Sequence, residues 1–412
     1  MCGCARRRNS FPARRKAINA AANARSASTT GGSVAAVKRY LFTPGPTPVP
    51  PEVLAAMGAP VVHHRSPDFR PVYERCLARL REVCRTESDV LLFTASGTGA
   101  FETAVVNLVS PGEPHLVVSA GSFGERWKSM TTAYGADVDT LEYAWGETPD
   151  PEDVRAKLAE REAKAVWVVQ SETSTGVVAD VQAIAEVAKE AGALVVVDAV
   201  SSLGAVPCEM DAWGLDVVVS GSQKALMTPP GLGLAAVSDA AFERRGSTPR
   251  FYFDWEKTRK AQRSLDAPFT PPVSLVAALD VALGLLLEEG LDAAFERHVR
   301  LGRAARAGAK AMGFELFSPD EDRSAVVTAV RSPESAEIIK ALRDRFGITL
   351  AGGQGDLKGK IFRIGHIGWF DIFDITTALA AVEIVSAELG LDVERGVAVT
   401  AALEAYEHTP VA

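Results

Sequence analysis

The chain has 412 residues and a formal net charge of −8, with 47% hydrophobic and 23% charged residues. This length predicts two or three domains with a substantial core, and the composition excludes a wholly disordered protein. No stretch reaches the ~18–20 uninterrupted apolar residues that a membrane-spanning helix requires.

The N-terminal end is basic and the rest of the chain is acidic. The first 39 residues carry nine Lys or Arg and no Asp or Glu, which leaves 35 basic against 52 acidic residues elsewhere. An acidic body is a poor partner for nucleic acid or an anionic membrane. Residues 1–38 lack the apolar core of a secretory signal. They fit a disordered tail, a start assigned too far upstream, or an organellar transit peptide.

Cysteine usage indicates the compartment. The five cysteines are scattered, without a Cys-x-x-Cys pair, which argues against a disulfide scaffold or a structural zinc site. No metal is therefore expected. A reducing compartment follows, and we expect the cytoplasm, or an organelle if the basic segment is a transit peptide.

From Arg39 onward, short β-branched runs alternate with amphipathic segments such as 150–162 and 181–191. The runs are apolar on both faces, which is typical of strands in a parallel sheet covered by helices. They lie at 90–95, 115–120, 165–170, 193–199, 217–221 and 232–238. This alternation predicts a large α/β domain over residues 39–290, with an N-terminal arm at 39–60.

The pattern changes after a long helical pair at about 273–312. The elements predicted beyond it are strands at 325–331 and 361–367, a helix at 333–346 between them, and a last helix at about 372–390. They predict a smaller α+β domain over residues 291–412.

A turn of small residues follows the strand at 90–95. Ser96, Gly97, Thr98 and Gly99 lead directly into a helix, so backbone N–H groups and the positive helix end can face an anion. No Lys follows Gly99 and the spacing is not Gly-x-Gly-x-x-Gly, which excludes a P-loop and a dinucleotide fingerprint. The turn predicts a phosphate site, with an ordinary helix cap as the alternative.

Two charged residues directly follow buried strands. Asp198 ends the apolar run at 193–199, where ligands of α/β sheets bind, although a structural cap would also explain it. Lys224 follows the strand at 217–221 among small residues; desolvation there would lower its pKa and make the amine a nucleophile. A phosphate turn, a strand-end Asp and a strand-end Lys together match pyridoxal phosphate, which needs an anchor, a protonated ring nitrogen and a Schiff-base amine.

In combination these motifs resemble those of class V, fold-type I aminotransferases, specifically the alanine/serine–glyoxylate (serine–pyruvate) branch. The resemblance covers about residues 40–390. Its marks are the phosphate turn together with Pro44–Pro50 (PGPTPVP), Ser171–Gly176 (SETSTG), Asp198–Ser202 (DAVSS) and Gly221–Leu226 (GSQKAL). It implies a mostly parallel, seven-stranded sheet covered by helices, a smaller C-terminal domain, pyridoxal phosphate, and a homodimer with active sites at the subunit interface.

The resemblance also implies a role for each matching residue. Cofactor contacts are implied for Ser96, Gly97, Thr98 and Gln223 (phosphate), Phe123 and Val200 (the two ring faces), Thr173 (ring hydroxyl), Asp198 (ring nitrogen), Lys224 (Schiff base) and Thr270 (phosphate, from the partner subunit). Some relatives have a phosphate-binding Tyr where this chain has Ala267, so part of the grip from the partner differs here. His63, His64 and Arg65 either line the partner's site or make an N-terminal loop contact.

Arg363 lies on an otherwise apolar strand, where a guanidinium is costly unless it meets an anion. The family position binds the substrate α-carboxylate, with a structural salt bridge as the alternative. The predicted reaction is transamination between alanine or serine and glyoxylate or pyruvate through a Lys224 Schiff base. A dicarboxylate aminotransferase, with Arg65 as the second cation, and a non-catalytic subunit of a larger complex remain alternatives. A cysteine desulfurase is set aside because no Cys follows Cys208.

Overall fold

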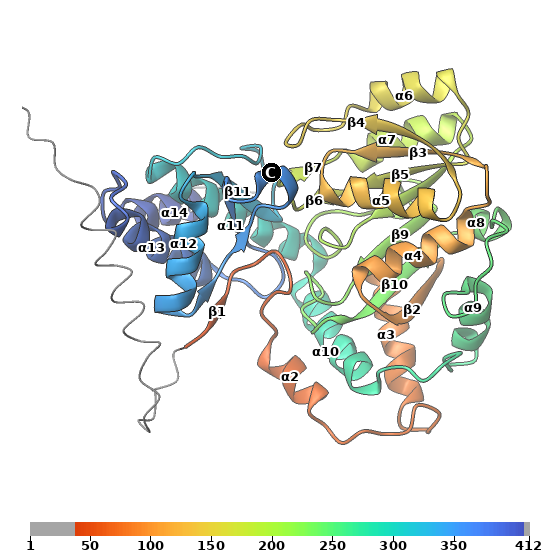
Figure 1. The fold of residues 1–412 in the computed structure, drawn as a ribbon. Helices are drawn as coiled ribbons and strands as arrows, with labels where there is room; N and C mark the ends of the chain where they lie inside the picture. Colours follow the sequence, from red (N-terminus) through yellow and green to blue (C-terminus); the bar gives the residue numbers. More distant parts are fainter. Residues whose placement is uncertain (1–37, 408–412) are drawn as a thin grey trace, which may run out of the picture. The chain divides into compact units, whose positions relative to one another are not determined.

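The computed structural model describes residues 38–407, and these form alternating strands and helices (Figure 1). The interpretations of residues 1–37 fall outside the described part of the chain and stay predictions. Within the described part, no helix combines the length and the apolar character needed to cross a membrane.

The main sheet has seven strands in the order β2-β10-β9-β8-β5-β3-β4. They are β2 (Asp89–Ala95), β3 (Pro114–Ser119), β4 (Asp137–Glu142), β5 (Ala165–Val169), β8 (Leu194–Asp198), β9 (Val217–Gly221) and β10 (Gly231–Val237). β10 runs antiparallel to both of its neighbours, and the other six strands are parallel to one another. The predicted α/β fold with a mostly parallel seven-stranded sheet is confirmed.

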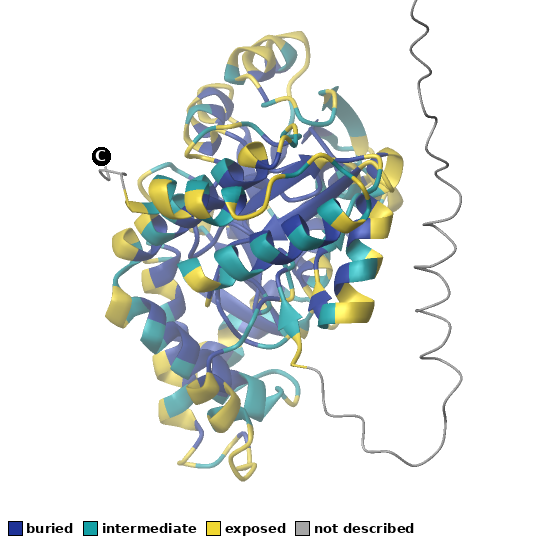
Figure 2. Ribbon diagram, turned by 90° about the vertical axis from the view of Figure 1, so that its left-hand side faces the viewer, coloured by how far each residue is buried: buried dark blue, intermediate teal, exposed yellow. Residues whose placement is uncertain are grey.

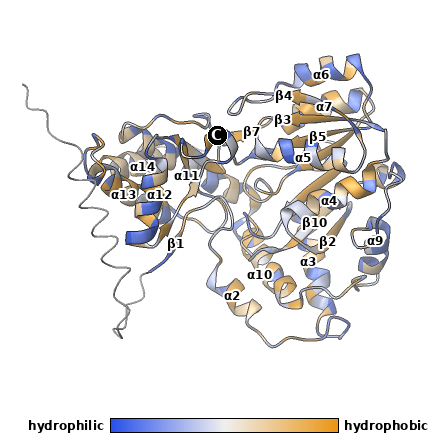
Figure 3. Ribbon diagram, viewed as in Figure 1, coloured by the Kyte–Doolittle hydropathy of each residue, from blue (hydrophilic) through white to orange (hydrophobic). Residues whose placement is uncertain are grey.

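Helices cover both faces of this sheet, because its strands are apolar on both faces. In β8, Val195 and Val197 belong to one core cluster while Leu194 and Val196 belong to the other. The first face packs against α3 (Arg70–Val83), α6 (Pro151–Glu160), α7 (Val181–Glu190) and α10 (Val273–Glu289). The second packs against α4 (Gly97–Leu108), α5 (Ser122–Ala133), α8 (Asp239–Glu243) and α9 (Trp255–Arg263). Figure 2 shows the buried strands between helices whose outer sides are exposed, and Figure 3 shows the apolar character of the same strands.

The edge strand β4 was not predicted. Its sequence DVDTLE is mostly polar, and each of its residues is exposed or partly exposed. A search for runs that are apolar on both faces finds interior strands and misses such an edge.

The C-terminal part has a three-stranded antiparallel sheet in the order β11-β14-β13. Its elements are β11 (Val327–Arg331), β13 (Ala351–Gly352), β14 (Ile361–Gly365), α11 (Leu291–Ala311), α12 (Ser335–Ala341), α13 (Ile372–Glu388) and α14 (Val397–Glu407). The helix expected at 333–346 is present as α12 up to Ala341 and continues as a π turn over Leu342–Phe346. One prediction here was wrong: the helix at 372–390 is not the last, because α14 follows it and packs on α11.

The N-terminal arm contacts the C-terminal part before it reaches the main sheet. β1 (Tyr40–Leu41) pairs in parallel with β12 (Ile348–Thr349), and the N–H of Gly365 donates to the carbonyl of Phe42 at 2.9 Å. The short helix α2 (Pro51–Met57) then packs against α10. The arm therefore spans both sheets, and the proposed domain boundary at residues 290 and 291 stays a prediction.

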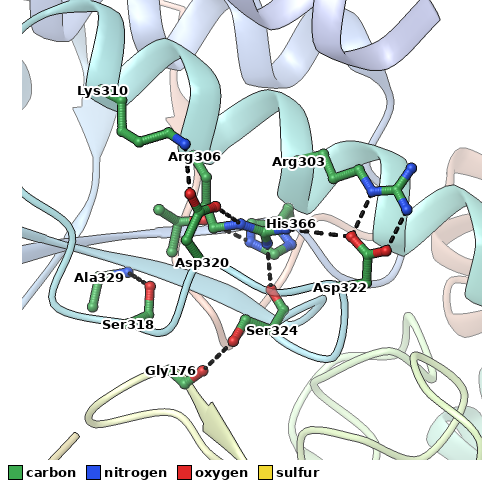
Figure 4. Close-up of polar contacts among 11 residues, drawn as sticks. Gly176, Arg303, Arg306, Lys310, Ser318, Asp320, Asp322, Ser324, Ala329 and His366 are labelled. Atoms are coloured by element: carbon green, nitrogen blue, oxygen red, sulfur yellow. Dashed lines mark hydrogen bonds and ion pairs between the residues drawn. The ribbon is translucent and has the colours of Figure 1, made fainter. Parts of the chain in front are cut away.

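A buried arginine ties the segment before β11 to helix α11 (Figure 4). Arg306, 2% exposed, donates to Asp320 Oδ1 and to the carbonyl of Ser324, both at 3.0 Å. The Ser324 hydroxyl in turn donates to the carbonyl of Gly176 at 3.1 Å, between β6 (Ser171–Glu172) and β7 (Val177–Val178). This chain of contacts links the C-terminal sheet to the turn that follows β5.

Replacing Arg306 with Ala should lower the free energy of unfolding by about 1.5–3 kcal/mol, the scale of hydrogen bonds to a charged group. The matched control is Arg303→Ala, on the same helix and paired with the same segment through Asp322, but more exposed. That variant should lose less than about 1 kcal/mol. Urea titrations of both variants measure the difference, and equal losses would show that burial of Arg306 adds no stability.

Candidate active site

Four parallel strands bring their carboxyl ends to one edge of the main sheet. β2, β5, β8 and β9 all end there, because they run in the same direction. The turn at Ser96 follows β2, Thr173 lies beyond β5, Asp198 ends β8 and Lys224 follows β9. Ligands of α/β sheets bind at this edge. The fold thus places the predicted charged and small residues on the same side of the molecule.

The lysine at this edge is enclosed. Lys224 is 9% exposed, and its Nζ donates to the carbonyl of Pro44 at 2.8 Å. Gly45 lies so close that a Cβ atom there would be 2.4 Å from Cδ, Cε and Nζ of Lys224. Burial lowers the pKa of Lys224 to about 8, while the nearby charge of Asp198 acts in the opposite direction. Near neutral pH a useful fraction of this amine is therefore unprotonated and nucleophilic.

Asp198 is a buried carboxylate at the end of β8. It is 4% exposed, and its Oδ1 accepts a hydrogen bond from the N–H of Val200 at 2.8 Å. The pKa of Asp198 is raised to about 7, chiefly by burial and also by the charge of Glu172, while the hydrogen bond from Val200 and the charges of Lys224 and Arg126 act in the opposite direction. The carboxylate is thus held where a cationic group would stabilise it strongly.

The small-residue turn forms a cradle at the N-terminus of α4. Ser96 caps the helix by accepting from the N–H of Gly99 at 3.3 Å. A Cβ atom at Gly97 would lie 3.0 Å from both methyl groups of Val200, so only glycine leaves this space open. A Cβ at Gly221 would lie 3.0 Å from Gln223 Oε1, which is buried without a hydrogen-bond partner among the described residues.

Glu172 organises the far side of the site, and sequence reasoning gave it no role. It is 2% exposed, and it accepts hydrogen bonds from the N–H groups of Phe123 (2.9 Å), Gly124 (3.2 Å) and Ser174 (3.2 Å). Burial raises the pKa of Glu172, against the effect of these donors. One carboxylate thereby fixes both the first turn of α5, which carries Phe123, and the buried turn that carries Thr173.

Arg363 enters from the C-terminal sheet. It is 5% exposed on β14, and its guanidinium donates to the carbonyls of Gly352, at 2.7 and 3.0 Å, and Thr173. Burial lowers the pKa of Arg363 to about 10. Among residues 38–407 no carboxylate forms an ion pair with it, so the described part of the chain gives no support to the alternative of a structural salt bridge. A buried cation that has only neutral partners can stabilise an anion placed beside it, so the role of Arg363 in binding a carboxylate stays a prediction.

The residues expected to act across subunits lie elsewhere on the chain. Thr270 is exposed and lines a surface hollow of about 490 Å³ together with His63 and His64. Arg65 pairs with Asp266 at 3.1 Å. The described contacts of Lys224 and Arg363 include none of these residues, so their roles stay predictions.

Arg126 is a second residue that sequence reasoning missed. Its Nη1 donates to Thr98 Oγ1 at 3.0 Å, and its guanidinium carbon lies 4.6 Å from the centroid of the Phe123 ring. The i, i+3 spacing of Phe123 and Arg126 was the available signal, because such residues share a helix face. For Glu172 the signal was its place just after an apolar strand, as for Asp198.

Comparison with known proteins agrees with this geometry. A model of the family "Aminotransferase class-V" matches residues 39–357. The chain belongs to this family. Members of this family depend on pyridoxal phosphate. In this class V aminotransferase, the lysine, aspartate and arginine expected from the sequence lie at one site.

Three relatives of this class V aminotransferase show that proteins similar to it carry different names. The chain is 45% identical to the soluble hydrogenase 42 kDa subunit of Anabaena cylindrica, over 86% of this chain and 94% of that protein. It is 36% identical to serine–glyoxylate aminotransferase of Methylorubrum extorquens, over 91% and 98%. The crystal structure of ureidoglycine–glyoxylate aminotransferase from Bacillus subtilis superposes with a TM-score of 0.86 at 32% identity, over 92% of this chain and all of that one.

The lowered pKa of Lys224 gives a pH-dependent prediction. Because only the free amine reacts, reductive methylation of the cofactor-free protein with formaldehyde and cyanoborohydride should label Lys224 with a midpoint near pH 8, well below the ordinary lysine pKa of 10.5. Asp198→Asn should move the midpoint lower still, since the carboxylate stabilises the protonated amine. Peptide mapping across pH, with the exposed Lys128 as internal reference, measures both. A wild-type midpoint near 10.5 would show that the amine is not desolvated.

Proposed function

We propose that this class V aminotransferase uses pyridoxal phosphate to transfer an amino group between alanine or serine and glyoxylate or pyruvate. The observation that carries the proposal is the desolvated amine of Lys224 beside the buried carboxylate of Asp198. The names of two relatives, serine–glyoxylate and ureidoglycine–glyoxylate aminotransferase, favour glyoxylate as the acceptor.

The residues present fit this cofactor. The space beside Gly97 and Gly221 suits a phosphate group held by Ser96, Thr98, the N–H groups of the Gln223 side-chain amide and the N-terminus of α4. Phe123 and Val200 would contact the two faces of the ring, and Thr173 its hydroxyl group. Asp198 would stabilise a proton on the ring nitrogen. The positive charge of that protonated nitrogen would in turn lower the pKa of Asp198, which burial raises.

The chemistry then divides between cofactor and chain. When bound, pyridoxal phosphate supplies an aldehyde carbon for a covalent bond to an amine and a ring that accepts electrons. Lys224 would hold the cofactor through its side-chain amine until a substrate amine takes its place. The freed amine of Lys224 would then accept the proton from the substrate Cα as a general base and return it as a general acid.

Arg363 would bind the substrate α-carboxylate. Its planar fork is buried, directed by two backbone carbonyls and without an ion-pair partner in residues 38–407. A bidentate carboxylate supplies the missing negative charge. Because one fork binds one carboxylate, small monocarboxylate amino acids fit better than aspartate or glutamate.

A homodimer would complete the site. The surface hollow lined by His63, His64 and Thr270 also carries Val61, which is 75% exposed. A second copy of the chain seated on this surface would bury the apolar residues and let Thr270 reach its partner's phosphate.

Two alternatives have less support. A dicarboxylate substrate needs a second cation, and the suggested Arg65 is already paired with Asp266. The name of one relative, a soluble hydrogenase subunit, raises a non-catalytic role in a larger complex. Such a role would not require Lys224, Asp198 and Arg363 to be buried together. A yellow protein whose colour is bleached by borohydride would favour the enzyme.

Lys224→Ala should lower kcat at least about 10³-fold, because the side chain is both the covalent anchor and the proton shuttle; general acid–base transfer alone contributes ~10²–10⁴. Lys128→Ala, on the exposed surface of α5, is the control and should keep wild-type turnover. Borohydride reduction followed by peptide mapping should place a pyridoxyl label on Lys224, and a label on another lysine would contradict the assignment.

Arg363→Lys should cost about 1.5–3 kcal/mol in kcat/KM, because lysine keeps the charge but loses the bidentate geometry. The loss should be similar for all amino acids, since all share the α-carboxylate. Arg331→Lys, at the exposed end of the neighbouring strand β11, is the control. Steady-state kinetics with alanine, serine and aspartate test this. An unchanged kcat/KM would place the carboxylate site elsewhere, and aspartate as the best wild-type substrate would favour the dicarboxylate alternative.

A further inference from the structure

The cradle proposed for the cofactor phosphate is built from neutral groups. Ser96, Thr98 and Gln223 carry no charge, and the N-terminus of α4 contributes only about half a positive charge. A phosphate monoester carries about −1.5 to −2 at pH 7. The buried carboxylates Asp198 and Glu172 lie at the same edge of the sheet and add negative charge. A phosphate there needs a further cation.

Arg126 supplies a cation at the edge of this cradle. It projects from the first turn of α5 and donates to Thr98 Oγ1 at 3.0 Å. Its charge also reaches into the site, since it lowers the pKa values of both Asp198 and Lys224. Among residues 38–407 no carboxylate lies within ion-pair distance of Arg126, whereas Lys128 on the same helix pairs with Glu142.

We propose that Arg126 binds the phosphate of the cofactor from the side of Thr98 and neutralises its charge. The inference rests on the proposed function, and it adds a phosphate ligand that neither the motifs nor the family resemblance indicated.

The hydrogen-bond directions support this placement. Because Thr98 Oγ1 accepts from Arg126, its own O–H remains available to donate to a phosphate oxygen. The guanidinium has five N–H donors, so the bond to Thr98 leaves others for the same phosphate. Arginine suits phosphate because its planar fork matches two oxygens at once.

Stacking on Phe123 holds the guanidinium in position. The guanidinium carbon lies 4.6 Å from the ring centroid, a cation–π contact that covers one face of the ring. Phe123 is itself fixed by its N–H bond to Glu172 at 2.9 Å. The guanidinium of Arg126 thus contacts both the Phe123 ring and Thr98, which fixes it at the N-terminus of α4.

A role in binding the substrate's distal group is less well supported. Thr98 belongs to the helix end that would hold the phosphate, whereas the α-carboxylate site at Arg363 is built from β13, β14 and Thr173. The bond between Arg126 and Thr98 ties the arginine to the phosphate side of the site.

The test compares pyridoxal phosphate with pyridoxal, which lacks the phosphate group. Dissociation constants of both are measured by fluorescence titration on cofactor-free wild type, Arg126→Gln, Arg126→Lys and the control Lys128→Gln. Arg126→Gln should weaken pyridoxal phosphate binding about 10- to 100-fold and change pyridoxal binding less than about twofold. Arg126→Lys should lose less, because the charge remains. Lys128→Gln should match the wild type.

Inorganic phosphate provides a readout without the cofactor ring. It should raise the Tm of the cofactor-free wild type and of Lys128→Gln, and this shift should be absent in Arg126→Gln.

Unchanged pyridoxal phosphate affinity in Arg126→Gln would overturn the inference. An equal loss of affinity for pyridoxal would overturn it as well, because the arginine would then act only through Phe123. Loss of aspartate turnover alone would make Arg126 a substrate residue and overturn it as well. By contrast, a wild type that binds no pyridoxal phosphate would refute the proposed function itself.

Discussion

Four ionisable side chains are buried together at one sheet edge, and each is stabilised by backbone groups of a different segment. Lys224 donates to Pro44, Asp198 accepts from Val200, Glu172 accepts from the start of α5, and Arg363 donates to β13 and to the turn at Thr173. Buried charge is costly unless it is hydrogen-bonded, so these bonds hold the N-terminal arm, α5, the turn and the C-terminal sheet in one arrangement. The hydrogen bonds that the buried charges require are therefore also the contacts that fix the geometry of the site.

The main sheet and the C-terminal sheet are connected at the turn that carries Thr173 and Gly176. The turn after β5 receives Arg363 through the carbonyl of Thr173 and Ser324 through the carbonyl of Gly176. Arg306 fixes Ser324 in turn. The C-terminal sheet is therefore attached at the same turn that carries Thr173, so a shift of this sheet would move the Arg363 guanidinium and Thr173 together.

Much of this could be predicted because it depends on local pattern. Interior strands such as β8 are apolar on both faces, and a charged residue directly after one, such as Asp198, is conspicuous. The edge strand β4 and helix α14 escaped, since a half-exposed strand and a mixed terminal helix have weaker patterns. Glu172 and Arg126 were missed for a different reason. Their partners, the N–H of Phe123 and the hydroxyl of Thr98, are 49 and 28 residues away and meet them only in the folded chain.

The pairing of the arm with the C-terminal part bears on the order of events during synthesis. β1 is among the first described residues to leave the ribosome, yet its partner β12 is made about three hundred residues later. The bond from Lys224 to Pro44 spans 180 positions, and Gly45 covers the lysine only once the arm is in place. Because contacts between distant residues form late in folding, the enclosure of Lys224 by the arm is completed late as well. The burial that lowers the pKa of Lys224 is therefore a property of the assembled fold and not of the local sequence around the lysine.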